Sequence, residues 1–273
     1  MPELPEVEVL RRSLEPRLVG RRIERVEVLS PALREPLDRR QLRSLAGRRI
    51  VALRRRGKYL WIDCEGGRTL VVHLGMSGRL TLVPARTPRE THEHLALRLD
   101  RGGRLRLRDP RRFGVAFVAA TRRLESDPRF LRLGREPLGA PLTGADLELL
   151  AIGRHGPVKS FLMDAGRIVG VGNIYASEAL HRARIRPDRS VARLSAASWE
   201  RLARAVVAVL EAAIREGGTT LNDFADGAGN DGEFQISLAV YGREGEPCPH
   251  CGGRVRRIVQ SGRSSFFCPR CQR

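Results

Sequence analysis

The spacing of apolar residues changes along this chain, and each spacing predicts a different kind of structure. Between residues 5 and 18 the apolar side chains recur at intervals of three or four, at Val7, Leu10, Leu14 and Leu18. That interval marks one face of a helix. Pro5 suits the first turn of such a helix, and Gly20 suits its end. We therefore expect an amphipathic helix at the start of the chain.

From residue 22 to residue 119 the apolar runs become short, and they either alternate with polar side chains or are wholly apolar. Eight runs stand out: 23–29, 50–54, 59–64, 69–74, 79–83, 95–99, 104–108 and 115–119. Gly, Pro or Asp separates many of them, and little helix fits between them. The pattern predicts an antiparallel sandwich or barrel. Together with the helix, it makes a first domain of residues 1–120.

Helical spacing returns after residue 142, beyond a stretch at 121–141 that is rich in Pro and Gly and that we interpret as a linker. Helices are expected over 143–152, 158–164, 173–183 and 195–216. Asn173 is a natural N-cap, and the glycine-rich turns before it predict a backbone clamp for phosphate, with a plain helical hairpin as the alternative. Residues 217–234 are rich in Gly and Asp and form either a lid or a loose loop. These segments make a second domain of residues 142–235.

Four of the five cysteines lie in the last segment, residues 236–273, as two Cys-x2-Cys pairs. The pairs are Cys248 with Cys251 and Cys268 with Cys271. Sixteen residues separate the pairs, a spacing typical of a structural site in which four thiolates hold one Zn²⁺. The residues between the pairs would form a β-hairpin with Arg263 near its tip, a shape suited to a DNA groove. A purely structural zinc ribbon is the alternative.

The charge of the chain indicates the class of its partner. There are 50 basic and 31 acidic residues, which give a net charge of +19. Such an excess favours nucleic acid, and no apolar run or basic amphipathic helix supports a membrane partner. Only two of the basic residues are lysine, Lys58 and Lys159. A lysine in a chain that otherwise uses arginine suggests a site that needs a compact, titratable amine.

The first residues, Met-Pro-Glu-Leu-Pro-Glu, carry candidate chemistry. Removal of the initiator Met would leave Pro2 with a secondary amine. An α-amino group has a pKa of roughly 8, so much of it is unprotonated near neutral pH and can attack a carbonyl-like carbon. Glu3 and Glu6 are close enough in sequence to move or hold protons. For an arbitrary chain, a proline-containing entry to a helix is the simpler interpretation.

Two loops place an apolar side chain where a core residue would not be expected. Met76 lies between two glycines in the run His-Leu-Gly-Met-Ser-Gly, and Phe113 follows two arginines in Asp-Pro-Arg-Arg-Phe-Gly. Proteins that distort DNA insert apolar wedges of this kind between base steps. An ordinary loop with one buried anchor is the alternative in each case.

In chain order, these motifs resemble those of the formamidopyrimidine-DNA glycosylase family. They are the start Met-Pro-Glu-Leu-Pro-Glu-Val-Glu, Arg-Gly-Lys-Tyr-Leu, the loops that contain Met76 and Phe113 (the two wedge loops), Gly-Val-Gly-Asn-Ile-Tyr-Ala and the four-cysteine finger. The resemblance implies an α+β fold, with an N-terminal β-sandwich and then a helical domain that contains a helix–two-turn–helix and a zinc finger. It also implies a bifunctional glycosylase and lyase that removes oxidised purines, chiefly 8-oxoguanine and formamidopyrimidines, from DNA in a basic cleft.

The resemblance also implies roles for individual residues. Pro2 would attack C1′ of the damaged nucleotide and form a Schiff base, Glu3 would assist opening of the sugar ring, and Glu6 would support them. Lys58 and Arg263 would act near the lesion and its phosphate. The DNA-binding set would be His73, His94, Met76, Arg111, Phe113, Lys159, Asn173 and Arg263. Within that set, Met76, Phe113 and Arg111 would fill the space left by the flipped base. Residues 217–234 would form a lid over the flipped purine itself.

Two other interpretations stay open. The endonuclease VIII branch prefers oxidised pyrimidines, but it typically has Gly where this chain has Leu4, and it lacks the full Met–Arg–Phe wedge. A non-catalytic zinc-ribbon protein that binds DNA would share the charge and the cysteines without needing Pro2, Glu3 or Lys58. We expect a cytoplasmic monomer with reduced thiols, since no targeting segment is evident. Its expected cofactor is one structural Zn²⁺, and its partner is duplex DNA with oxidised bases or abasic sites.

Overall fold

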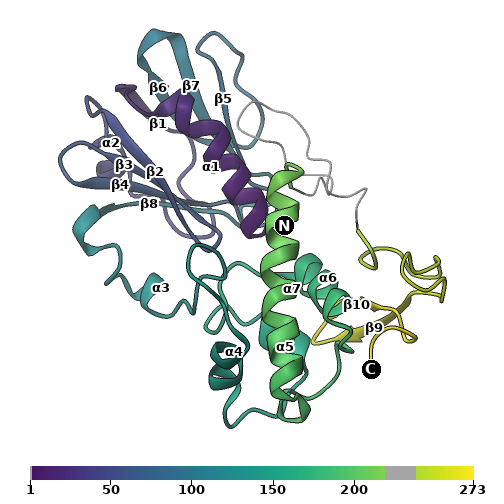
Figure 1. The fold of residues 1–273 in the computed structure, drawn as a ribbon. Coiled ribbons are helices and arrows are strands. Elements are labelled where there is room, and N and C mark those ends of the chain that lie inside the picture. The colour runs from purple at the N-terminus through teal and green to yellow at the C-terminus, as the bar shows by residue number, and fades with distance from the viewer. Residues whose placement is uncertain (1, 219–237) are drawn as a thin grey trace. The chain divides into compact units, whose positions relative to one another are not determined.

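The computed structural model describes residues 2–218 and 238–273, and within them the chain divides into two compact units (Figure 1). The first unit contains residues 2–131 and 216–218, and the second contains residues 132–215 and 238–273. The division after Leu131 falls inside the stretch that the sequence suggested as a linker.

Helix α1 (Leu4–Leu18) forms where the spacing of three and four predicts a helix. The Glu6 carboxylate accepts the backbone N–H of Glu3 at 2.8 Å, which satisfies one of the donors that a helix start leaves unpaired. The apolar face, Val7, Leu10, Leu14 and Leu18, is at most 1% exposed. The helix packs along strand β2 (Ile50–Arg56), so burial of this face attaches the N-terminus to the sheet.

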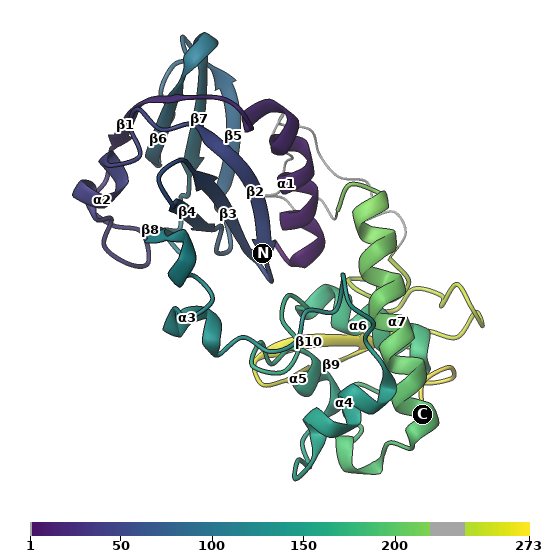
Figure 2. The same cartoon turned by 60° about the vertical axis from the view of Figure 1, so that its left-hand side comes forward.

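Two four-stranded antiparallel sheets form most of the rest of the first unit (Figure 2). One has the order β2-β3-β4-β8, with β3 (Tyr59–Cys64), β4 (Arg68–His73) and β8 (Val115–Ala120). The other has the order β1-β6-β7-β5, with β1 (Ile23–Val28), β6 (Glu93–Leu99), β7 (Gly103–Arg108) and β5 (Arg79–Pro84). Short helices α2 (Arg39–Arg43) and η1 (Asp100–Gly102) connect strands. Side chains of both sheets and of α1 share one core, so the unit is a sandwich.

Part of the expected linker packs on the first sheet. It contains η2 (Thr121–Arg123) and α3 (Pro128–Leu131). Phe130 is 5% exposed, and its ring centroid lies 5.1 Å from that of Tyr59 and 4.9 Å from that of Trp61, both edge-on. Aromatic packing therefore attaches residues up to 131 to the sandwich, which the Pro and Gly content could not indicate.

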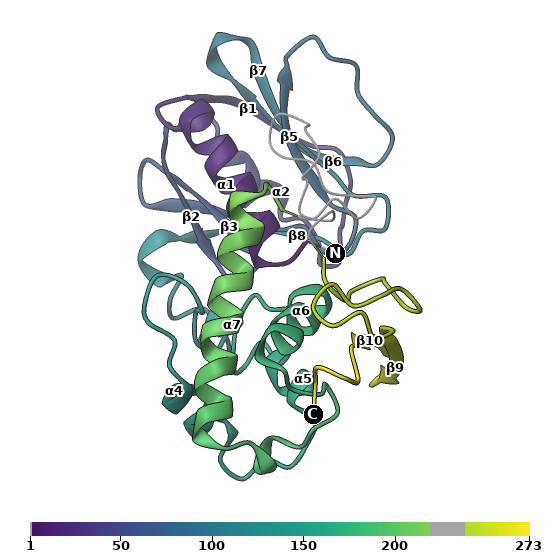
Figure 3. The same cartoon turned by 45° about the vertical axis from the view of Figure 1, so that its right-hand side comes forward.

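The second unit is mainly helical (Figure 3). It contains α4 (Gly144–Ala151), α5 (Val158–Leu162), α6 (Asn173–Ala183), η3 (Val191–Arg193) and α7 (Ala196–Arg215), followed by a hairpin of β9 (Arg256–Gln260) and β10 (Arg263–Phe267). Helix α6 packs against α7 and β10. Its N-cap is Gly172 and not Asn173, which is the first helical residue. Among the helices of the described residues, none is long and apolar enough to cross a bilayer.

Candidate nucleic-acid interface and metal site

The predicted catalytic N-terminus is buried in the first unit. Pro2 is buried, and Glu3 and Glu6 are each 2% exposed. Glu8, to which the sequence analysis gave no role, accepts hydrogen bonds from Arg11 and Arg12 and from Arg55 Nε at 3.1 Å. Burial alone would raise the pKa of Glu8, but the hydrogen bonds and charges of these arginines outweigh it and lower the pKa to about 2. The resulting anion holds the first turns of α1 against the end of β2.

Lys58 lies in the two-residue turn that joins β2 to β3, directly after that end of β2. Its neighbour Tyr59 pairs with His73, at the end of β4. Burial first, and then the positive charge of Lys58, lower the pKa of His73 to about 4. His73 Nδ1 accepts the backbone N–H of Gly75 at 3.1 Å. The imidazole is therefore neutral near pH 7, and its proton is on Nε2, where it can donate to a phosphate oxygen.

The structure brings the two wedge loops together. Gly75 has φ 63°, and a side-chain Cβ at this position would lie 2.4 Å from the carbonyl carbon of Phe113. Only glycine allows this approach of the two backbones. Met76 is 38% exposed and Phe113 is 42% exposed, whereas the guanidinium carbon of Arg111 lies 4.9 Å from the Phe113 ring centroid. The three predicted wedge residues thus form one exposed group of two apolar side chains and a cation.

The buried side chain of Asp109 holds these loops in place. It is fully buried, and its carboxylate accepts the Ser77 hydroxyl at 2.6 Å and the Gly114 backbone N–H at 2.7 Å. The Ser77 hydroxyl oxygen in turn accepts the backbone N–H of Arg111 at 3.2 Å. No role for Asp109 or Ser77 followed from the sequence, since Asp before Pro and Ser before Gly are ordinary turn residues.

His94, predicted to bind DNA, is 2% exposed, and its Nε2 lies 2.8 Å from the carbonyl oxygen of Asp109. A carbonyl oxygen only accepts, so His94 donates this hydrogen bond and supports the Asp109 loop from inside. The neighbouring His92 is exposed and has φ 65°, in the left-handed region. The imidazole that this turn presents to solvent is therefore that of His92, which the sequence analysis passed over.

In the second unit, the side chain of Lys159 joins three segments. It is 2% exposed, and its Nζ donates to Asn173 Oδ1 at 2.7 Å, to the Ser264 carbonyl at 2.8 Å and to the Ser265 hydroxyl at 2.8 Å. An ammonium group has three N–H donors, and these acceptors match that number. Lys159 thus lies beside Asn173, as a phosphate site shared by the two residues would require. Its side chain, however, is buried in the protein and not presented to solvent.

Glu178 of α6 is a second buried anchor that the sequence analysis missed. It is 5% exposed, and its carboxylate accepts the backbone N–H groups of Ala239, Val240 and Tyr241 at 2.8 to 3.0 Å. Its position among the mostly apolar buried residues of α6 was the available signal. The contact fixes the chain at residues 239–241. Most of the predicted lid of residues 217–234, from residue 219 onward, lies outside the described residues.

Arg263 is exposed at the tip of the β9–β10 hairpin. The turn consists of Ser261 and Gly262, with φ of 48° and 72°. Two successive positive φ angles characterise the tight turn that joins twisted antiparallel strands. The hairpin and its arginine therefore form as the cysteine spacing predicts.

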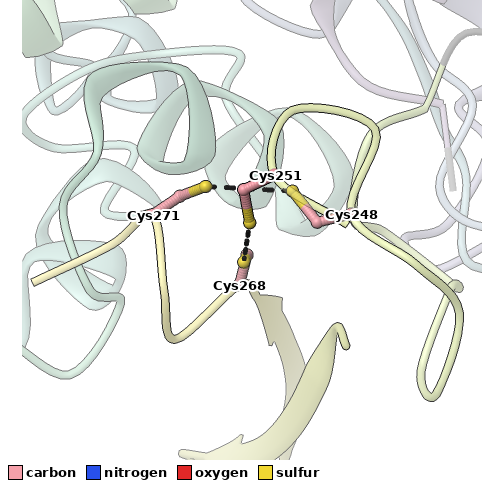
Figure 4. A group of neighbouring side chains, drawn as sticks. All are labelled: Cys248, Cys251, Cys268 and Cys271. Atoms are coloured by element: carbon pink, nitrogen blue, oxygen red, sulfur yellow. Dashed lines mark hydrogen bonds between the residues drawn. The ribbon is translucent and has the colours of Figure 1, made fainter. Parts of the chain in front are cut away.

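The four cysteines of the finger meet in one group (Figure 4). Their sulfurs all lie within 4.8 Å of one another, with Cys251 and Cys268 3.5 Å apart and Cys248 and Cys271 3.9 Å apart. Sulfurs at about 2.3 Å from a tetrahedral Zn²⁺ are about 3.8 Å from each other. The backbone N–H of Gly253 donates to Cys251 Sγ at 3.4 Å and lowers the pKa of that thiol to about 7. Donor type, number and spacing fit one structural Zn²⁺.

Comparisons with known proteins give the same result for each part of the chain. Three family models match: the formamidopyrimidine-DNA glycosylase N-terminal domain at residues 1–116, the formamidopyrimidine-DNA glycosylase H2TH domain at 133–225, and the zinc finger found in FPG and IleRS at 245–273. Curated relatives named formamidopyrimidine-DNA glycosylase come from Halorhodospira halophila, with 50% identity, and Xanthomonas campestris, with 48%. Each alignment covers 100% of both chains.

Solved structures agree over the whole length. The MutM (Fpg) protein of Thermus thermophilus has a TM-score of 0.88 at 41% identity, and the alignment covers 99% of this chain and 98% of that one. Lactococcus lactis Fpg in complex with DNA that contains an abasic site has a TM-score of 0.91 at 34% identity, with 99% of both chains covered. The matches to the family models cover most of the chain, and those to the curated relatives cover all of it. This protein therefore belongs to the formamidopyrimidine-DNA glycosylase family.

Proposed function

We propose that this protein is a bifunctional DNA glycosylase and lyase of base excision repair that removes oxidised purines from duplex DNA. The observation that carries the proposal is the full-length match, at 50% identity, to a formamidopyrimidine-DNA glycosylase. Related Lactococcus lactis structures contain DNA with Fapy-dG or with an abasic site. The net charge of +19 suits a DNA partner. Its place of action would be the cytoplasm.

We assign the chemistry to the N-terminus. After removal of the initiator Met, the Pro2 nitrogen attacks C1′ of the damaged nucleotide, and the bond from C1′ to the base breaks. Protonation at the sugar by Glu3 opens the ring and leaves an iminium ion. The iminium acidifies the neighbouring C–H bonds, so loss of a proton expels the 3′ phosphate and a second elimination expels the 5′ phosphate. Hydrolysis of the iminium then releases Pro2.

Residues of the described loops would bind the opened duplex. Met76, Arg111 and Phe113 would fill the space of the flipped nucleotide, whose extrusion costs a few kcal/mol. Lys58 and the Nε2–H of His73 would meet phosphate near the lesion. From the exposures above, we assign His92 to the DNA surface and His94 to its support.

The phosphate clamp of the second unit is assigned in the same way. The α6 N-terminus, with Asn173, and the exposed Arg263 would contact the backbone of the DNA. Lys159 would orient both from inside, since three protein acceptors surround its ammonium group. Its positive charge would still favour the phosphate at short range.

A borohydride trapping experiment tests the proposal. The protein is mixed with a duplex that carries one 8-oxoguanine opposite cytosine, the mixture is reduced, and the cross-linked peptide is identified by mass spectrometry. A cross-link at Pro2 is expected, and Pro2→Gly should lose strand cleavage but keep DNA binding. The trap is repeated with a duplex that carries an oxidised pyrimidine. A cross-link on that duplex alone would favour the endonuclease VIII activity. Binding without any cross-link would leave a non-catalytic DNA-binding protein.

A further inference from the structure

His181, in the last turn of α6, lies next to the zinc site. Its Nε2 is 3.4 Å from the Sγ of Cys248, which is 2% exposed and 67 residues away in the sequence. A zinc-bound thiolate carries no proton and can only accept, so in the metal-bound protein the imidazole must be the donor. No role for this histidine followed from the cysteine spacing or from the wedge and clamp residues.

The same end of α6 also receives the other half of the finger. The Gln272 side chain is 1% exposed, accepts the Cys268 backbone N–H at 2.8 Å and donates to the Ile185 carbonyl at 2.8 Å. Each Cys-x2-Cys pair is thus tied to residues at or just after the end of α6. Of these two contacts with the end of α6, the histidine contact is the one that reaches a sulfur that would bind the metal.

We propose that His181 is a positioning residue of the zinc site, which donates Nε2–H to the Cys248 thiolate and so connects the metal to α6. Four thiolates around one divalent ion leave a net negative charge, and a donated hydrogen bond offsets part of it. Zinc is retained longer as a result. The proposal concerns the metal site, and it does not depend on the glycosylase reaction.

The test separates hydrogen bonding from packing. His181→Phe keeps an aromatic ring without a donor, and His181→Gln keeps an N–H donor without the ring. His181→Ala is a second variant without a donor, in case the Phe variant fails to fold. His155→Phe is the matched control, because His155 is an exposed histidine of a loop in the same unit.

The first measurement is the rate at which the zinc-loaded full chain releases its metal to a chromophoric chelator, without DNA. Loss of the donor should speed release about tenfold or more, the effect typical of removing a hydrogen-bond partner of a metal ligand. The Gln variant should release zinc at a rate near that of the wild type, and the control should be unchanged. Equal rates for the Phe variant and the wild type would overturn the proposal, and so would a Gln variant as fast as the Phe variant.

The second measurement uses the cobalt-substituted protein. A donated hydrogen bond lowers the energy of the sulfur lone pair, so its loss should shift the thiolate-to-cobalt charge-transfer band to longer wavelength. The Phe or Ala variant should show this shift and the Gln variant should show less of it. An unshifted band in the donor-less variants would contradict a hydrogen bond to the metal-bound sulfur. Lesion excision enters neither measurement, so failure here leaves the proposed function untouched.

Discussion

The two units each build part of the proposed DNA surface around one buried charge, but the charges are of opposite sign and have different reach. Asp109 in the first unit accepts hydrogen bonds from its own loop and from a loop 32 residues away. Lys159 in the second unit donates to a helix start and to a hairpin more than 100 residues away. Each supports exposed side chains without being exposed itself.

The difference indicates what each part of the surface requires. The wedge needs two short loops in contact, and hydroxyl and backbone donors around a carboxylate suffice. The clamp needs a hairpin to be held on a helix start, and the structure uses a buried ammonium group together with a metal site. The second unit should therefore depend more on single contacts than the first.

Removal of zinc should give the largest effect, and it should be confined to the second unit. Structural zinc in small finger peptides contributes on the order of 10 kcal/mol to folding, and the first unit contains no comparable group of ligands among its described residues. Chelation should increase amide hydrogen exchange over residues 248–271 and weaken DNA binding. Exchange at 59–73 should stay unchanged. Undiminished binding by protein shown to lack metal would refute a docking role for the finger.

Lys159→Met should have the second-largest effect. It leaves three acceptors without their donor, one of them the fully buried Ser265 hydroxyl, which costs about 3 kcal/mol or more. Urea unfolding should show this loss, whereas Arg204→Met, at an exposed position of α7, should change stability little. If stability were retained and only the salt dependence of DNA binding fell, Lys159 would be a direct phosphate contact and the contrast with Asp109 would disappear.

Replacement of the Asp109 anchor should cost less, because Asn keeps one acceptor oxygen and Ser77→Ala removes a single hydroxyl. Asp109→Asn and Ser77→Ala should each reduce stability by about 1–2 kcal/mol. Both should impair insertion of the wedge, measured with 2-aminopurine next to the lesion, more than overall DNA binding. Ser126→Ala, which removes an exposed hydroxyl, is the control. A normal 2-aminopurine signal in both variants would show that the wedge needs no support from Asp109.

The smallest effect concerns the pH dependence of the first unit. The folded-state pKa of His73 is lowered to about 4, below its ordinary value of 6.5, so the unfolded chain binds the proton more readily. Stability from this group is complete above about pH 6.5 and falls as the pH drops toward 4, by roughly 1 kcal/mol at pH 5.5. Urea unfolding at pH 7 and pH 5.5 should show a smaller drop for His73→Gln. Equal drops would place the titration elsewhere.

The elements that the sequence predicted well depend on residues close together in the chain. The interval of Val7, Leu10 and Leu14 reflects the period of a helix, and the alternation of residues 95–99 reflects that of a strand. The Cys-x2-Cys pairs depend on local turns in the same way. Such patterns determined the helix α1, the strands of the sandwich and the four-thiolate site.

The anchors could not be predicted, because their partners meet only in the folded chain. Nothing near Lys159 in sequence indicates Ser264 and Ser265, and nothing near His181 indicates Cys248. His92 and His94 are the same residue type two positions apart, so the sequence alone does not distinguish them, and only packing decides which one is buried. Periodicity determined which elements form. Tertiary structure decided which polar side chains face solvent and which form hydrogen bonds with other protein groups in the interior. The reason is that a buried charge persists only where distant segments supply its hydrogen bonds.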